Sequence, residues 1–115
     1  MLPALTCSYQ CNGTPAQNWT VPADWGSITV VDGNGQNWCL DRGSDGVDGA
    51  KLKIWQCYGR IPAQSWGYDA AANRIQNDDR VRCLDVTDGQ FVAGNVPQTW
   101  TCYDGNTNQA WQYVQ

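Results

Sequence analysis

The sequence predicts a single all-β domain, residues 1–115, built from three related repeats. Short β-type runs such as "SITVV", "KLKIW" and "WQYVQ" are separated by turn clusters, and the chain contains twelve Gly, often as Asp-Gly or Asn-Gly, and five Pro. Helical periodicity is weak, and a length of 115 residues is typical of one domain. The third observation is internal repetition, which constrains the fold more strongly than local propensity does. We place the repeats at about residues 1–32, 33–76 and 77–115.

Each repeat is defined by a Gln-x-Trp step. The three steps recur roughly every 46 residues; they are "PAQNW" at 15–19, "PAQSW" at 62–66 and "TNQAW" at 107–111. Upstream of the last two, "WCLDR" at 38–42 matches "RCLDV" at 82–86, and "IWQCYG" at 54–59 matches "TWTCYDG" at 99–105. A single repeat cannot bury its own apolar face, so three must pack together. We therefore expect Trp19, Trp66 and Trp111 in the core.

Composition excludes several classes of function. The net charge is −4 and the seven Lys and Arg are scattered, which disfavours nucleic acid and anionic membranes as partners. No apolar run approaches the roughly 20 residues that span a bilayer, so we expect no membrane insertion. There is no His to serve as a general base, and Asp78 and Asp79 in "NDDR" are typical of an exposed turn before a strand. We expect no enzyme activity, no metal site and no cofactor.

Six Cys in a chain without His favour disulfides over a zinc site. Disulfides form in oxidising compartments, so the sequence predicts a secreted or extracellular protein. The start, "MLPALTCSYQ", lacks the charged and long apolar segments of a signal peptide.

The ordered set of Cys-Leu-Asp, Trp-x-Cys and Gln-x-Trp motifs resembles that of the ricin B-type lectins, and the resemblance covers nearly the whole chain. It implies a β-trefoil fold with three pseudo-threefold repeats. It also implies disulfides within a repeat, Cys39–Cys57 and Cys83–Cys102, each worth roughly 3 kcal/mol in the chain-entropy account. Cys7 and Cys11 then either bond each other or stay free.

The chain departs from the family pattern at its ends. No Cys-Leu-Asp precedes Cys7, and the chain stops at Gln115, just after the third strand of the last repeat. We therefore expect the first strand of repeat one and the last strand of repeat three to be missing. A fragment, a naturally trimmed trefoil, or a barrel completed by a partner chain or a homo-oligomer would each explain this pattern.

The resemblance implies a galactose-type site in the third repeat, where all five family positions match: Asp85, Gln98, Trp100, Asn108 and Gln109. An ionised Asp accepts hydrogen bonds from adjacent sugar hydroxyls, and a Trp face covers the C–H patch of the ring. Asn108 both donates and accepts, while the two Gln side chains bind ligand or orient Asp85. Asp88, Gly89 and Gly94 shape the neighbouring loop. We expect Asp85 at a solvent-facing cleft, where it contributes little packing.

The other two repeats match less well. The second keeps Asp41, Trp55 and Gln64, but Lys53 replaces the Gln and Ala63 replaces the Asn. We expect a weaker site there, in which Lys53 pairs with Asp41. In the first repeat Tyr9 lies near the aromatic position, but Ala16 replaces the Asn and the Asp strand is missing, so this repeat is expected to be silent.

The leading hypothesis is a carbohydrate-binding lectin that recognises galactose or N-acetylgalactosamine. One alternative is a polysaccharide-binding module of a glycoside hydrolase, with a ligand such as xylan. Another is a trefoil with a vestigial sugar site that acts through its loops on a protein target such as a protease, although no loop is long or distinctive.

Overall fold

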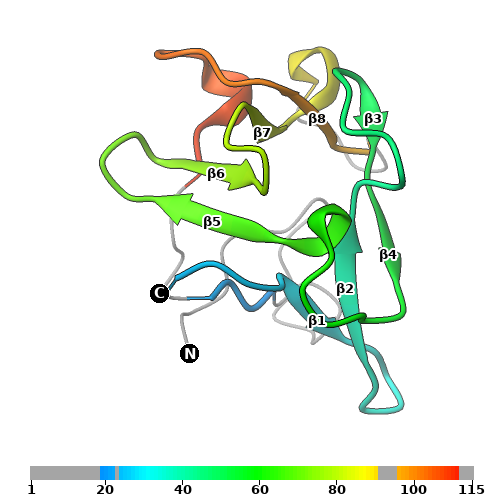
Figure 1. Ribbon diagram of the computed structural model, residues 1–115. Coiled ribbons are helices and arrows are strands. Elements are labelled where there is room, and N and C mark those ends of the chain that lie inside the picture. Colours follow the sequence, from blue (N-terminus) through cyan, green and yellow to red (C-terminus); the bar gives the residue numbers. More distant parts are fainter. Residues whose placement is uncertain (1–18, 23, 91–95, 112–115) are drawn as a thin grey trace.

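The computed structural model describes residues 19–22, 24–90 and 96–111. These residues form short strands and 3₁₀ turns and contain no α-helix, which confirms the all-β prediction (Figure 1). The strands are β1 (Thr29–Val31), β2 (Asn37–Asp41), β3 (Ala50–Lys51), β4 (Lys53–Trp55), β5 (Trp66–Asp69), β6 (Arg74–Asn77), β7 (Arg82–Asp85) and β8 (Gln98–Thr101). The 3₁₀ turns are η2 (Pro62–Gln64), η3 (Thr87–Gly89) and η4 (Thr107–Gln109). None of the helical turns in these ranges is long and apolar enough to cross a bilayer.

The strands form two antiparallel sheets. One has the order β1-β2-β4 and the other β3-β8-β7-β6-β5, and in Figure 1 the long β5–β6 hairpin lies between the β1-β2-β4 sheet and the β7–β8 pair. Because β3 precedes β4 in the chain but pairs with β8, the five-stranded sheet joins segments from the predicted second and third repeats. The candidate site lies along this junction.

The Cys-Leu-Asp and Trp-x-Cys motifs pair in the same register in two repeats. Cys39 is opposite Trp55 on β2 and β4, and Cys83 is opposite Trp100 on β7 and β8. Two residues further on, each Asp faces the position where the family has Gln: Asp41 faces Lys53, and Asp85 faces Gln98. The repeated sequence therefore folds into repeated strand pairs.

The Gln-x-Trp tryptophans pack on the core as expected. Trp66 is fully buried among residues that include Val21, Ile28, Leu40, Leu52, Ile75 and Leu84, while Trp19 and Trp111 are half-buried against the same cluster. The indole N–H of Trp66 donates to the carbonyl oxygen of Leu40 at 3.0 Å, and that of Trp111 donates to Leu84 at 2.9 Å. Each Trp thus finds the partner that a buried indole requires and fixes the middle residue of a Cys-Leu-Asp motif.

Both predicted disulfides are confirmed. Cys39–Cys57 and Cys83–Cys102 join residues whose Cα atoms are 5.1 Å apart, with sequence separations of 18 and 19. Each bond links a strand, β2 or β7, to the residues just after its partner strand, β4 or β8, so it restrains the strand pair that carries the site residues. Cys7, Cys11, Tyr9, Ala16 and Gly94 lie outside the described residues, as do both chain ends. The expectation of two missing strands therefore stays a prediction.

Candidate functional site

The five candidate residues of the third repeat come together on the β7–β8 pair and η4. Asp85 ends β7 and is directly opposite Gln98, which begins β8, so both side chains lie on one face of the sheet. Trp100 lies two residues beyond Gln98 and shares that face, because side chains alternate along a strand. The backbone N–H of Val86 donates to the carbonyl oxygen of Asn108 at 2.8 Å, which attaches η4 to the end of β7.

Asp85 is buried, contrary to the expectation of an exposed carboxylate that contributes little packing. Only 3% of the residue is exposed. Gln98 Nε2 donates to one carboxylate oxygen at 3.1 Å, and Gln109 Nε2 donates to the other at 3.1 Å. The reason for the burial is structural: Asp85 ends a strand whose last residues are all buried, and two amides enclose its carboxylate. Asp85 therefore supports the fold as well as presenting an acceptor.

Gln109 acts as a positioning residue. Its Oε1 accepts the backbone N–H of Tyr103 at 3.1 Å, and its Nε2 donates to Asp85 and to the carbonyl oxygen of Thr101 at 2.9 Å. An amide has two N–H donors, so both are already used. With only 2% of the residue exposed, Gln109 orients Asp85 and has no donor left for a ligand.

Trp100 and Asn108 are the accessible members of the set. Trp100 is 38% exposed. The side-chain amide of Asn108 makes no hydrogen bond within the described parts of the chain. Gly89, on η3, has a φ of +67°, and a Cβ placed on it would lie 2.9 Å from Asn108 Oδ1. Only glycine therefore fits both the backbone and the space beside the amide, in agreement with a loop-shaping role for Gly89.

Lys51 joins the site from the preceding repeat, and sequence reasoning missed it. It pairs with Gln98 across β3 and β8, so Asp85, Gln98 and Lys51 form one row over three strands. Lys51 Nζ donates to Gln98 Oε1 at 3.0 Å and to Thr87 Oγ1 at 3.0 Å. Because the ammonium takes the amide oxygen of Gln98, the NH₂ group faces Asp85. No motif contains Lys51, so only the strand pairing reveals its role.

The second repeat has the same scaffold with a different surface. Asp41, 5% exposed, accepts the N–H of Gly43 at 2.6 Å and Nε2 of Gln64 at 3.0 Å. Lys53 lies opposite Asp41 in the strand register, but the two side chains make no ion pair within the described structure. Its Nζ lies 4.5 Å from the centroid of the Trp55 ring, a cation–π contact that covers one face of the indole. The expected Lys53–Asp41 ion pair is therefore wrong, since Asp41 is already enclosed by its own donors.

Asp78 and Asp79 lie in an exposed turn between β6 and β7, as the sequence indicated. The described residues contain no group of His, Cys, Asp or Glu side chains arranged to hold a metal ion.

The arrangement of strands matches a known fold. The structure is similar to the crystal structure of a designed threefold-symmetric protein, ThreeFoil, with a TM-score of 0.73 and 20% sequence identity over 100% of this chain and 84% of that one. This likeness places the chain among the β-trefoil proteins. The search of curated proteins found no match.

The family follows from the sequence match. The model of the ricin-type β-trefoil lectin domain matches residues 3–111, and the chain belongs to this family. It is therefore a carbohydrate-binding domain of a typically non-catalytic kind. The two disulfides in the described part of the chain are consistent with an extracellular location.

Proposed function

We propose that the domain binds galactose or N-acetylgalactosamine through the third repeat. One observation carries the proposal: a carboxylate fixed by two glutamine amides lies on the same strand-pair face as an exposed indole, beside an asparagine amide with no hydrogen bond to the described protein. These groups are Asp85, Trp100 and Asn108. The second repeat lacks the asparagine and has one indole face covered by Lys53.

Each group has a separate task in this proposal. The two hydrogen bonds to Asp85 leave carboxylate lone pairs unused, and these accept charge-assisted hydrogen bonds from adjacent sugar hydroxyls. The Trp100 ring covers the C–H face of the sugar, which in galactose is continuous because one ring hydroxyl is axial. Asn108 donates to or accepts from a further hydroxyl. Gln98 and Gln109 keep the carboxylate in place, so its side chain loses little conformational freedom when the ligand binds.

The affinity of such a site for one monosaccharide is expected to be weak, roughly millimolar to tens of micromolar, or about −4 to −7 kcal/mol. Only a few groups contact the ligand and the surface is shallow. Strong attachment to a glycan-bearing surface then requires several linked sites.

Calorimetric titration with galactose, N-acetylgalactosamine and a xylo-oligosaccharide tests the proposal. Trp100→Ala and Asn108→Ala should each abolish measurable galactose binding, because each removes a group that contacts the sugar. Both variants should fold, because neither residue is fully buried. Trp55→Ala is the matched control: it removes an exposed indole at the equivalent register position of the second repeat and should bind like wild type.

Two results would contradict the proposal. Loss of binding in Trp55→Ala but not in Trp100→Ala would assign the site to the second repeat. Tighter binding of xylo-oligosaccharide than of either galactose-type sugar would favour the polysaccharide-binding module, and absence of any glycan binding would favour the vestigial trefoil.

We also propose that the protein is secreted, supported by its disulfides, and detection of the native chain outside the cell tests this. Completion of the barrel by a partner chain or a second copy stays a prediction. Light scattering of the purified protein tests it, and a monomer at all concentrations would count against a homo-oligomer.

A further inference from the structure

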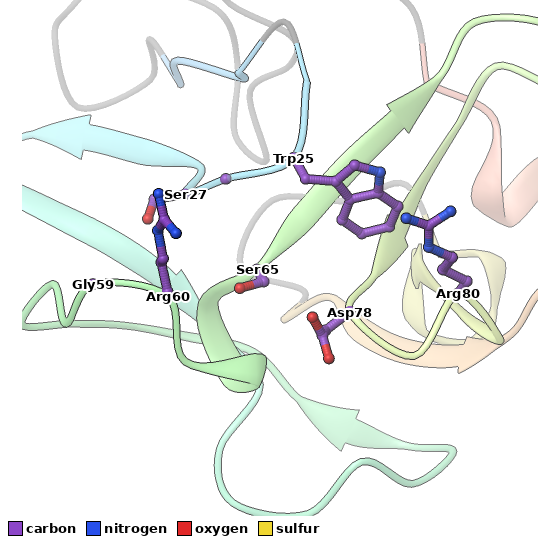
Figure 2. Close-up of a pocket in the computed structure, with 8 residues that line it drawn as sticks. Trp25, Ser27, Gly59, Arg60, Ser65, Asp78 and Arg80 are labelled. Carbon is purple, nitrogen blue, oxygen red and sulfur yellow. The ribbon is translucent and has the colours of Figure 1, made fainter.

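A pocket of about 580 Å³ lies apart from the third-repeat site and contains none of its residues. It is lined by the segment Trp25–Ser27, the turn Gly59–Arg60, Ser65, Asp78 and Arg80 (Figure 2). Backbone hydrogen bonds between Gly26 and Trp66, at 2.8 and 3.0 Å, hold the first of these segments against β5. The volume is within the roughly 300–1,000 Å³ of typical ligand sites.

The basic residues of the chain divide into two groups by their partners. All seven lie in the described residues. Four make side-chain hydrogen bonds: Arg42 to Asn77, Arg74 to Asp104, Arg82 to Asp79 and Lys51 to Gln98. Lys53 lies over Trp55, outside the pocket. The remaining two, Arg60 and Arg80, make no side-chain hydrogen bond or ion pair within the described structure, and both line the pocket.

Arg80 is positioned without using its N–H donors. Its guanidinium carbon lies 4.6 Å from the centroid of the Trp25 ring, and a cation–π contact leaves all five N–H groups available. Trp25 is itself fixed by β5, because a Cβ on Gly67 would lie only 2.6 Å from the indole. The pocket therefore has one preorganised cation, and Figure 2 shows Arg60 with Ser27 on the opposite side from Trp25 and Arg80.

Both arginines also have left-handed backbones, with φ of 60° for Arg60 and 61° for Arg80. This conformation is unfavourable for a residue with a Cβ, and Gly or Asn would adopt it more easily. Two long cationic side chains therefore line one pocket from positions where Gly or Asn would adopt the left-handed backbone at a lower conformational free energy.

The lining is locally positive in an acidic protein. Two arginines and one aspartate, Asp78, give a sum of +1, whereas the whole chain has a net charge of −4. Asp78 makes no ion pair with either arginine in the described residues, so both guanidinium groups remain available to a ligand.

We propose that this pocket is a separate binding site for an acidic sugar, one that bears a carboxylate or a sulfate group. Arg60 and Arg80 face the ligand from opposite sides of the pocket, and each guanidinium can bind an anionic group of the ligand, because it matches the geometry of such oxyanions. Asp78 and the hydroxyls of Ser27 and Ser65 accept from or donate to the neutral hydroxyls of the same ligand. The site goes beyond the galactose site proposed above and does not depend on it.

Titration of the intact chain with three probes tests the proposal: a galacturonic acid oligosaccharide, a sulfated galactoside and the uncharged galactose oligosaccharide. Arg60→Gln and Arg80→Gln should each weaken binding of at least one charged probe by roughly ten-fold or more, since each removes a charge-assisted hydrogen bond. Comparison of the two charged probes distinguishes a carboxylate ligand from a sulfate ligand. In Trp100→Ala, where the third-repeat site is impaired, the part of the charged-probe binding that depends on Arg60 and Arg80 should persist, which separates this site from the third-repeat site.

Arg74→Gln is the control, because it removes the same charge from β6 outside the pocket. Near-UV circular dichroism checks that each variant is folded. Because Arg60 is exposed, Arg60→Gln is the substitution expected to disturb the core least. Equal weakening by Arg74→Gln and Arg60→Gln would indicate general charge attraction and overturn the proposal. So would charged probes that bind no more tightly than the uncharged one.

Discussion

Replacing Asp85 with alanine removes an acceptor from the buried side of the site, and this perturbation tests the physical account most directly. Two amide N–H groups lose their partner: one from Gln98 and one from Gln109, each now 3.1 Å from a carboxylate oxygen. The second N–H of Gln109 keeps its bond to Thr101. The residues around the lost carboxylate are buried, so water replaces it poorly.

The magnitude follows from the unmade hydrogen bonds. An unsatisfied buried donor costs about 1–3 kcal/mol, so two of them should lower the free energy of unfolding by roughly 2–4 kcal/mol once some relaxation of the amides is allowed. Domains of this kind have about 5–15 kcal/mol in total. Asp85→Ala is therefore expected to destabilise the fold as well as abolish sugar binding.

Urea unfolding with the disulfides intact measures the effect, with Asp45→Ala as the control. Asp45 is exposed and makes no hydrogen bond within the described residues, so its removal should change stability by less than about 0.5 kcal/mol. Asp85→Asn should cost less than Asp85→Ala, because the amide keeps one acceptor oxygen. If Asp85→Ala unfolds at the same urea concentration as Asp45→Ala, the two glutamine hydrogen bonds contribute little to stability, which would contradict this prediction.

Three further predictions concern stability. Hydrogen bonds from the Trp38 indole and from two backbone N–H groups lower the pKa of Asp32. The stability this provides is present above the usual Asp pKa of about 4 and is lost as the pH falls through the lowered value. The unfolding free energies of wild type and Asp32→Asn should therefore differ at pH 6 and converge as the pH is lowered. Replacing Cys83 and Cys102 together with alanine should lower the free energy of unfolding by roughly 3 kcal/mol in a denaturant titration, and an unchanged midpoint would contradict the chain-entropy account. Gly67→Ala should lower the Tm and shift the tryptophan fluorescence, because its Cβ would lie 2.6 Å from an indole; an unaltered spectrum would show that the ring moves freely.

The fold and disulfides could be predicted because their evidence is repeated along the chain. Trp66 and Trp111 each donate to the leucine of a Cys-Leu-Asp motif, so each Gln-x-Trp step encodes a contact that recurs. The strand registers recur in the same way, and the disulfides Cys39–Cys57 and Cys83–Cys102 follow from them. Three-dimensional symmetry is thus visible as sequence similarity.

The depth and the surroundings of the candidate site could not be predicted in the same way. The five third-repeat residues match the family pattern, but that pattern does not state whether Asp85 is exposed. Its burial depends on the two glutamines that enclose it, and the orientation of one of them, Gln98, depends on Lys51, which β3 brings to β8. Pairing between distant strands leaves no periodic signal, so this contact was beyond sequence reasoning.

The hydrogen bond from Lys51 to Gln98 affects whether a duplicated repeat keeps its binding site. A duplicated repeat is often treated as a portable unit that takes its function with it when it is copied or transplanted. Here the orientation of Gln98 in the third repeat depends on Lys51 of the second repeat. If the third repeat were copied beside a repeat with another residue at the Lys51 position, the Gln98 amide would be less constrained. Substitution of Lys51 in the second repeat is therefore constrained by its contact with the third repeat, even though the second repeat's own surface is altered.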